Sequence, residues 1–384
     1  MADSCTTNRS VLEASEKNMQ TQRYSQEKIS RRDASSRWLA DFEIPGFTPH
    51  RLLRTGHLQT LISARLGEAN RTFPSTHRRH HVDLPDGDAV VMHDDEPHGW
   101  NPEAGAVLML HGICGCHAAP YMIRFQRRLG QLGIRTFRLD MRGCGDSASF
   151  CESITHAGRS EDVISAVEFI AGLIDDANSP IGAVGVSLGG NQLLLTAGRV
   201  GNGFHKIPKG WDRIGPILAI APPLDLQRCS DAMQSPALRF YNWYFITHLL
   251  RRASPRLQAR EDYQQMLSLP RPRTLRYFDR TFTAPLAGFE SEQVYYRESS
   301  AAPVVEHIQV PTLIVTADDD PLVPIESFEE LLEQGRHEKG QPSPVRLHVS
   351  RGGGHHGFLK RDRTSWTDDL VSEFFREGLR KSRQ

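Results

Sequence analysis

Short apolar runs alternate with amphipathic stretches along most of the chain. The runs "AVLMLHG", "IGAVGVS" and "VPTLIVTA" are almost wholly apolar, which is typical of strands buried on both faces of a parallel sheet. Between two of them, the stretch 160–174 places Val163, Val167, Ile170 and Ile174 on one helical face. This alternation predicts an α/β fold with a mostly parallel sheet and helices on both faces, and functional residues at the carboxyl ends of the strands.

Two regions depart from this alternation. Residues 1–35 are polar and lack periodicity, so we expect a disordered tail ahead of a single domain over 36–384. An aromatic-rich stretch at about 224–305 is too long for a simple loop, and we expect it to form an inserted helical lid. Its segment "SPALRFYNWYFITHLL" carries apolar residues that would either seal the lid against the body or wall an acyl pocket: Phe240, Tyr241, Tyr244, Phe245 and Leu249.

The balance of charge argues against a polyanionic partner. Lys+Arg and Asp+Glu both number 46 in the 384 residues, so no overall field would attract nucleic acid or an acidic membrane surface. No apolar run reaches the roughly 18 residues of a membrane-spanning helix, and the first residues lack the pattern of a secretion signal. The 6 cysteines show no paired spacing. We therefore expect a cytoplasmic protein with reduced thiols and no integral membrane span.

The histidine-rich cluster "HRRHH" at 77–81 is the main candidate for a metal site. Its two arginines would repel a cation, so we expect no metal ion there. Nothing else in the sequence indicates a metal or an organic cofactor.

Residues 185–189 match the pattern G-x-S-x-G, with Ser187 between Gly185 and Gly189. An apolar strand precedes the motif and a helical stretch follows it, which is the context of a nucleophile elbow. The elbow is a tight turn that lifts a serine above the sheet, and side chains at the two glycines would collide with its neighbours. A helix N-cap would explain the hydroxyl of Ser187 but not the flanking glycines.

A serine nucleophile needs an acid and a histidine, which in this fold type follow it in that order. After the seventh apolar strand, "TADDDPLVP" supplies Asp318, Asp319 and Asp320. We assign Asp320, which starts the turn at the strand end, as the acid, with Asp319 as the alternative and Asp225 as a more distant one. The remaining acids would cap the helix expected from Ile325.

The segment "RGGGHHGFL" follows the last strand. Its glycines would let the loop swing an imidazole over the nucleophile, so we assign His355 as the base and expect His356 to pack or to contact solvent.

An oxyanion hole would stabilise the tetrahedral intermediate. Its expected donors are the backbone N–H groups of Leu188, directly after the nucleophile, and of Ile113, in the loop after "AVLMLHG". We expect His111 to shape this loop and Cys114 to act as a small packing residue rather than a reactive thiol.

A series of further motifs resembles the YheT-like subfamily of α/β-hydrolases. They occur in order over about residues 38–375: "GHLQT", "LHGICG", "RGCGDS", "HAG", "GVSLGGNQLL", "YFDRTFTAPLAGF", "VYYRES", "DDDPLVP" and "GGGHHGF". The resemblance implies an eight-stranded α/β-hydrolase fold, a triad of Ser187, Asp320 and His355, and carboxylesterase or monoacylglycerol-lipase-like activity in lipid metabolism. Relatives that act on membrane lipids usually carry an N-terminal membrane helix, whereas this chain has a polar tail there.

The combined prediction is a serine hydrolase that cleaves a small-molecule ester or an acyl lipid through an acyl-enzyme. Two alternatives stay open at this point. The same triad would serve an acyltransferase or a thioesterase, and the chain would otherwise be a non-catalytic binding protein built on the hydrolase fold. The sequence assigns no role to "GHLQT".

Overall fold

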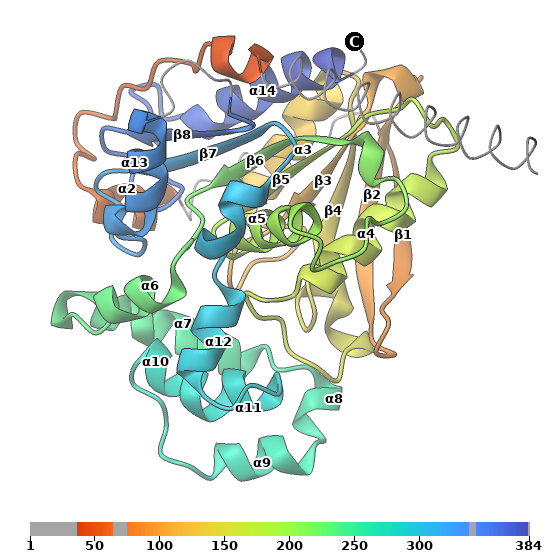
Figure 1. The fold of residues 1–384 in the computed structure, drawn as a ribbon. Coiled ribbons are helices and arrows are strands. Elements are labelled where there is room, and N and C mark those ends of the chain that lie inside the picture. The colour runs from red at the N-terminus through yellow and green to blue at the C-terminus, as the bar shows by residue number, and fades with distance from the viewer. Residues whose placement is uncertain (1–36, 64–74, 338–342, 383–384) are drawn as a thin grey trace, which may run out of the picture.

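The computed structural model describes residues 37–63, 75–337 and 343–382, so the tail expected at 1–35 lies outside the described residues. At its centre is an eight-stranded sheet in the order β1-β2-β4-β3-β5-β6-β7-β8 (Figure 1). The strands are β1 (Ser75–Asp83), β2 (Ala89–Pro97), β3 (Ala106–Leu110), β4 (Arg135–Asp140), β5 (Ile181–Val186), β6 (Ile214–Ile220), β7 (Thr312–Ala317) and β8 (Val345–Ser350). Strand β2 pairs antiparallel with both of its neighbours, β1 and β4, and all pairs among β3 to β8 are parallel.

Helices cover both faces of the sheet. One face packs on α3 (Pro120–Gln131) and α14 (Trp366–Lys381), and the other on α4 (Ser160–Leu173) and α5 (Leu188–Gly201). Alternate residues of each central strand point to opposite faces, so Val107 and Leu108 of β3 belong to different halves of the core. The residues predicted to share one face of α4 and the turn after it are all buried: Val163, Val167, Ile170 and Ile174.

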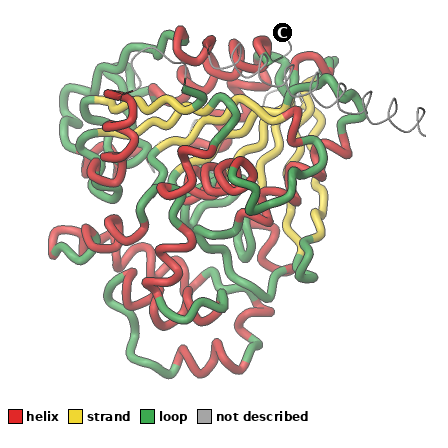
Figure 2. Tube along the Cα trace, viewed as in Figure 1, coloured by secondary structure: helices red, strands yellow, loops and turns green. Residues whose placement is uncertain are grey.

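A helical insertion connects β6 to β7, in the region where the sequence predicts a lid. Figures 1 and 2 show it below the sheet, beside the carboxyl ends of the strands and without strands of its own. Its helices are α6 (Leu226–Ala232), α7 (Arg239–Arg251), α8 (Pro255–Gln258), α9 (Glu261–Leu267), α10 (Leu275–Phe278), α11 (Ala284–Leu286) and α12 (Glu292–Ser299). It has a small core of its own: Ile246, Leu257, Tyr263, Phe278, Phe282 and Leu286.

The remaining helical elements are short. Helix α2 (Gly56–Ser63) precedes the sheet, and α13 (Glu329–His337) lies between β7 and β8. The 3₁₀ turns are η1 (Pro102–Ala104), η2 (Gly145–Phe150), η3 (Trp211–Arg213), η4 (Pro236–Leu238), η6 (Ala302–His307) and η7 (Ile325–Phe328), and η5 (Asp279–Thr283) is π-helical. Within the described ranges, no helix combines the length and the hydropathy that a membrane crossing requires.

Candidate active site

Ser187 occupies a strained turn between β5 and α5. Its φ of 53° and ψ of −118° lie outside the regions that a residue with a side chain ordinarily adopts. A Cβ on Gly185 would lie 2.4 Å from the backbone of Gly189, and a Cβ on Gly189 would lie 2.7 Å from the carbonyl oxygen of His111. The glycines of the motif are therefore needed for close backbone approach. The serine is only 7% exposed, less than expected for the tip of an elbow, and side chains of the insertion line the same cavity.

Ser187, His355 and Asp320 form one chain of hydrogen bonds. Nε2 of His355 lies 2.8 Å from Oγ of Ser187, and Nδ1 lies 2.8 Å from Oδ2 of Asp320. The carboxylate of Asp320 is fully buried, and its other oxygen accepts the N–H groups of Leu322 and Val323. Since a carboxylate only accepts, the Nδ1–H donates to Asp320, which leaves Nε2 free to accept the serine proton.

The two neighbouring acids do not reach the imidazole and do not cap the next helix. Oδ1 of Asp318 accepts the N–H of Gly352, and Oδ1 of Asp319 accepts the N–H of Gly354. They therefore fix the glycine run ahead of His355. The more distant alternative, Asp225, caps the start of α6.

The loop of His355 depends on its glycines. Gly352, Gly353 and Gly354 all have positive φ, at 73°, 129° and 60°. His356, the alternative base, is half-buried with its ring centroid 5.5 Å from that of Tyr121, and desolvation of the imidazole lowers its pKa to about 3. It therefore stays neutral and packs against the rings of Tyr121 and His355.

Of the two expected oxyanion donors, Ile113 lies in the loop after β3 and Leu188 is the first residue of α5. The N–H of Gly112 donates to the hydroxyl of Tyr121 at 2.8 Å. In the part of the chain that the structure describes, the amides of Ile113 and Leu188 donate no hydrogen bond, and both residues line the same cavity as Ser187. Two unoccupied N–H groups beside a serine oxygen are the arrangement that an oxyanion requires.

His111 braces this loop, as the sequence predicts. Its Nδ1–H donates to the carbonyl of Gly112 at 2.8 Å, and its Nε2 accepts the N–H of Met141 at 3.2 Å. Burial lowers the pKa of His111, which is consistent with a neutral imidazole. Burial raises the pKa of the Cys114 thiol to about 12, so this cysteine is not a reactive thiolate.

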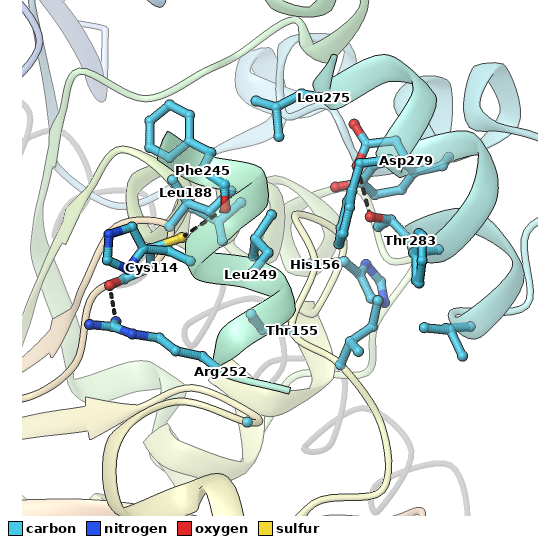
Figure 3. A pocket seen from close by; sticks show the side chains of 18 of the residues that line it. Cys114, Thr155, His156, Leu188, Phe245, Leu249, Arg252, Leu275, Asp279 and Thr283 are labelled. Carbon is cyan, nitrogen blue, oxygen red and sulfur yellow. Dashed lines mark hydrogen bonds between the residues drawn. The ribbon is translucent and has the colours of Figure 1, made fainter. Parts of the chain in front are cut away.

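A cavity of about 210 Å³ extends from the serine into the insertion (Figure 3). Ser187, Leu188 and His355 line it from the body, and Phe245 and Leu249 line it from α7. Directly after this helix, Arg252 donates to the carbonyl of Cys114 in the loop after β3. Of the aromatic stretch singled out in the sequence, Phe240 and Tyr244 instead face outward, at 50% and 39% exposure.

His156 and Asp279 line the cavity at the side of α10 to α12 (Figure 3). Burial holds the pKa of His156 well below its usual value, so the imidazole is neutral. Burial raises the pKa of the Asp279 carboxyl to about 6, although it accepts hydrogen bonds from Thr283 at 2.7 Å and from Tyr296 at 2.8 Å.

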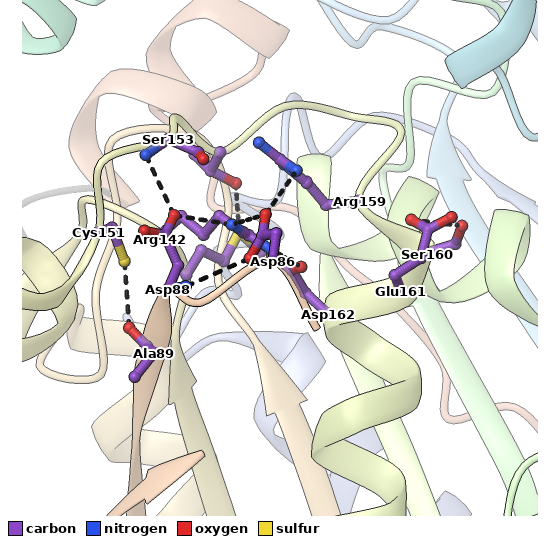
Figure 4. A network of polar contacts seen from close by, with 12 residues as sticks. Asp86, Asp88, Ala89, Arg142, Cys151, Ser153, Arg159, Ser160, Glu161 and Asp162 are labelled. Carbon is purple, nitrogen blue, oxygen red and sulfur yellow. Dashed lines mark hydrogen bonds and ion pairs between the residues drawn. The ribbon is translucent and has the colours of Figure 1, made fainter. Parts of the chain in front are cut away.

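Arg142 lines the cavity and lies at the centre of an ionic network within the body (Figure 4). The guanidinium of Arg142 donates to Asp162, Asp86 and Asp88 at 2.6–2.7 Å. These acids come from the β1–β2 turn and the start of α4. Burial opposes the charge of Arg142, yet its hydrogen bonds to the acids outweigh that effect and raise its pKa. Arg142, the arginine of "RGCGDS", therefore has a structural role and holds the β1–β2 turn against the start of α4.

One group of side chains in the described residues has the donor types of a metal site: His93, His117, Asp140 and Asp146, with ligand atoms within 4.8 Å of one another. Two imidazole nitrogens and two carboxylate oxygens would suit a zinc ion. In this structure Oδ2 of Asp140 instead lies within hydrogen-bonding distance of both imidazoles, 2.6 Å from Nδ1 of His117 and 3.3 Å from Nε2 of His93. Oδ1 of Asp140 accepts the backbone N–H of His117, so the group anchors the loop after β3.

The "HRRHH" cluster does not gather into one site. His77 pairs with Asp95 at 3.0 Å and His80 with Asp94 at 2.9 Å, along the β1–β2 ladder.

Comparison with known proteins gives consistent results. A family model described as "Alpha/beta hydrolase family" matches residues 107–365. The chain is 27% identical over 318 residues to "Putative esterase YheT" of Escherichia coli, covering 82% of this chain and 87% of that protein. It is 24% identical over 260 residues to human "Phospholipase ABHD3", covering 66% of this chain and 58% of that protein.

A solved structure of the esterase Pf2001 from Pyrococcus furiosus is similar in fold. The TM-score is 0.50 and the sequence identity 17%, over 80% of this chain and 94% of that one.

Proposed function

The chain belongs to the alpha/beta hydrolase family, and on that premise we propose that it is a serine hydrolase of carboxylic esters. Its esterase and phospholipase relatives support ester hydrolysis in general. The observation that carries the finer proposal is the hydrogen-bonded chain of Ser187, His355 and Asp320, with both links at 2.8 Å.

In the proposed mechanism, Oγ of Ser187 attacks the ester carbonyl while Nε2 of His355 takes the serine proton. Asp320 holds the imidazole in the correct tautomer and stabilises its positive charge. The N–H groups of Leu188 and Ile113 bind the oxyanion of the tetrahedral intermediate. His355 then gives its proton to the leaving alcohol, and water activated by the same imidazole releases the acid.

The proposed substrate has an apolar acyl group and is a small ester or an acyl lipid. The cavity beside Ser187 supports this choice, because Phe245, Leu249 and other apolar side chains of the insertion line it. We propose that the insertion acts as the lid of the site, since its side chains line the cavity that contains Ser187 and supply this wall. Monoacylglycerol-lipase-like activity is the most specific form of the proposal.

The experiment compares hydrolysis of a p-nitrophenyl ester by the wild type and by Ser187→Ala, with labelling by a fluorophosphonate probe. We expect the variant to lose roughly 10⁴-fold or more in kcat/KM and all labelling while keeping its thermal unfolding temperature. A wild type that neither hydrolyses esters nor labels would instead indicate a non-catalytic binding protein. Product analysis with an added alcohol distinguishes hydrolysis from acyl transfer, since both use the same acyl-enzyme.

A further inference from the structure

Helix α2, which carries the motif "GHLQT", lies directly against the loops of the acid and of the base. A Cβ on Gly56 would lie 1.8 Å from the backbone oxygen of Asp319. On the other side, a Cβ on Gly354 would lie 2.3 Å from the oxygen of Gly56, and a Cβ on Gly357 would lie 2.6 Å from the oxygen of Gln59. Because glycines stand at these contacts, the backbone of α2 can approach the backbones of both loops closely.

Thr60 makes the contact nearest to the reacting groups. Its Oγ1 accepts the backbone N–H of His355 at 2.9 Å and donates to the carbonyl of Gly56 at 2.7 Å. Because the hydroxyl proton is used on Gly56, a lone pair of the oxygen faces the His355 amide. Thr60 is 7% exposed and His355 is 5% exposed, so water has little access to replace this bond.

Gln59 holds the other end of the same loop. Its Oε1 accepts the N–H of Leu359 at 2.6 Å, and its Nε2 donates to the carbonyls of Leu53 and Leu359 at 2.9 and 3.3 Å. The amide of Gln59 is buried, at 1% exposure for the residue. Helix α2 therefore forms hydrogen bonds to the loop of His355 at two points, the backbone of His355 and the backbone of Leu359.

The same helix also meets the insertion. Nδ1 of His57 lies 3.2 Å from the hydroxyl of Tyr241, and the two rings stack with centroids 5.7 Å apart. Tyr241 belongs to α7, the helix that lines the cavity through Phe245. The motif thus connects the base loop with the acyl-binding side of the site.

We propose that Thr60 is a positioning residue, which fixes the backbone of His355 so that its imidazole stays in line between Ser187 and Asp320. The inference rests on the proposed function of the same site. Without the acceptor, the buried N–H of His355 loses its partner and the loop can shift. A shift of about 1 Å in a reacting group is enough to reduce a rate roughly 100-fold. Thr60 itself touches no substrate, so substrate binding should change little.

The test compares Thr60→Val, which keeps the shape and removes the acceptor, with Thr60→Ser, which restores a hydroxyl. Leu58→Ala is the matched control, because Leu58 lies on the same helix and is 41% exposed. For each variant we would measure kcat and KM on a p-nitrophenyl ester, the rate of fluorophosphonate labelling, and thermal unfolding. All rates are taken well below the unfolding temperature of the least stable variant.

We expect Thr60→Val to lower kcat and the labelling rate by roughly 10- to 100-fold, with KM within about twofold. Thr60→Ser should recover most of the loss, and Leu58→Ala should behave as the wild type. If Thr60→Val cannot be purified, Thr60→Ala carries the same expectation, since it also lacks the acceptor.

Unchanged kcat and labelling in Thr60→Val, even with a lower unfolding temperature, would overturn the inference and leave only a structural role. Equal impairment of Thr60→Ser would overturn it too. Ester hydrolysis that is abolished by Ser187→Ala but not slowed by Thr60→Val refutes the inference and leaves the proposed function standing. A wild type without activity or labelling refutes both.

Discussion

At the residue scale, three consecutive aspartates have three different partners. Asp318 and Asp319 accept backbone N–H groups of the glycine run, and only Asp320 reaches His355. Each acid is thus held by a different directional bond, and the sequence, which favoured Asp320, had left Asp319 open as the partner of the imidazole. We predict that Asp320→Asn lowers kcat/KM by about 10⁴-fold, because an amide can hold the wrong tautomer of the imidazole.

Asp318→Asn and Asp319→Asn serve as matched controls for that measurement and should cost far less, since an amide oxygen can still accept the glycine N–H. A crippled Asp319→Asn beside an active Asp320→Asn would move the acid by one residue. In the same assay, His355→Ala should be inactive and His356→Ala only weakened.

The carboxyl of Asp279 gives a prediction about pH. Burial raises its pKa from 3.8 to about 6 in the folded protein, so the folded state holds a proton that the unfolded chain has lost. The stabilisation by this protonation is full below about pH 4 and is lost as the pH rises through about 6. Asp279→Asn stays neutral and should therefore gain thermal stability relative to the wild type as the pH rises from 4.5 to 7.5. A difference in unfolding temperature that does not depend on pH would contradict this assignment.

At the scale of elements, α7 has two faces with different roles. Phe245 and Leu249 line the cavity, whereas Tyr244 is 39% exposed and lies outside it. We predict that Phe245→Ala and Leu249→Ala change the preferred acyl length in a series of p-nitrophenyl esters. Each methylene held by the wall gains at most about 0.8 kcal/mol, so kcat/KM should climb by up to roughly fourfold per carbon until the pocket ends.

Tyr244→Ala is the control for that series, because it removes an aromatic ring from the same helix without touching the cavity. An identical chain-length profile for all three variants, with only a loss of stability, would mean that α7 merely covers the site.

At the scale of the whole molecule, Arg142 ties the antiparallel edge of the sheet to the parallel part. It is 2% exposed and donates to three acids from two segments, the β1–β2 turn and the start of α4. We predict that Arg142→Met lowers the free energy of unfolding by about 3–5 kcal/mol, because it leaves buried carboxylates without their partner. Urea unfolding would measure this change.

Arg78→Met is the comparison for that measurement. The side chain of Arg78 is 46% exposed and pairs with Glu96 at 3.1 Å and with Asp94 at 3.8 Å. Because Asp94 keeps its two hydrogen bonds from Arg135, the loss of Arg78 should cost less than about 1 kcal/mol. Equal effects of the two substitutions would show that burial of the Arg142 network adds nothing to the free energy of unfolding.

The sheet and its helices could be read from the sequence because burial imposes local patterns. Strands covered on both faces are continuously apolar, as in "AVLMLHG", and the buried face of α4 repeats with the helical period. The strained turn at Ser187 could also be predicted from the sequence. The glycines that its close backbone contacts require lie within the five residues of the motif itself. Because Ser187, Asp320 and His355 each follow a strand that the sequence predicts, each could be proposed as part of the site.

Only the tertiary structure decided the contacts between segments that are distant in sequence. Thr60 and His355 are separated by 295 residues, and no local pattern encodes which hydroxyl will face which amide. The direction of Phe245 into the cavity and of Tyr244 away from it depends likewise on how α7 docks on the body. The sequence determined the elements and the chemistry at their ends, because those follow from local geometry and solvation. The partner of each side chain was decided by packing, which brings remote groups together only once the whole chain has folded.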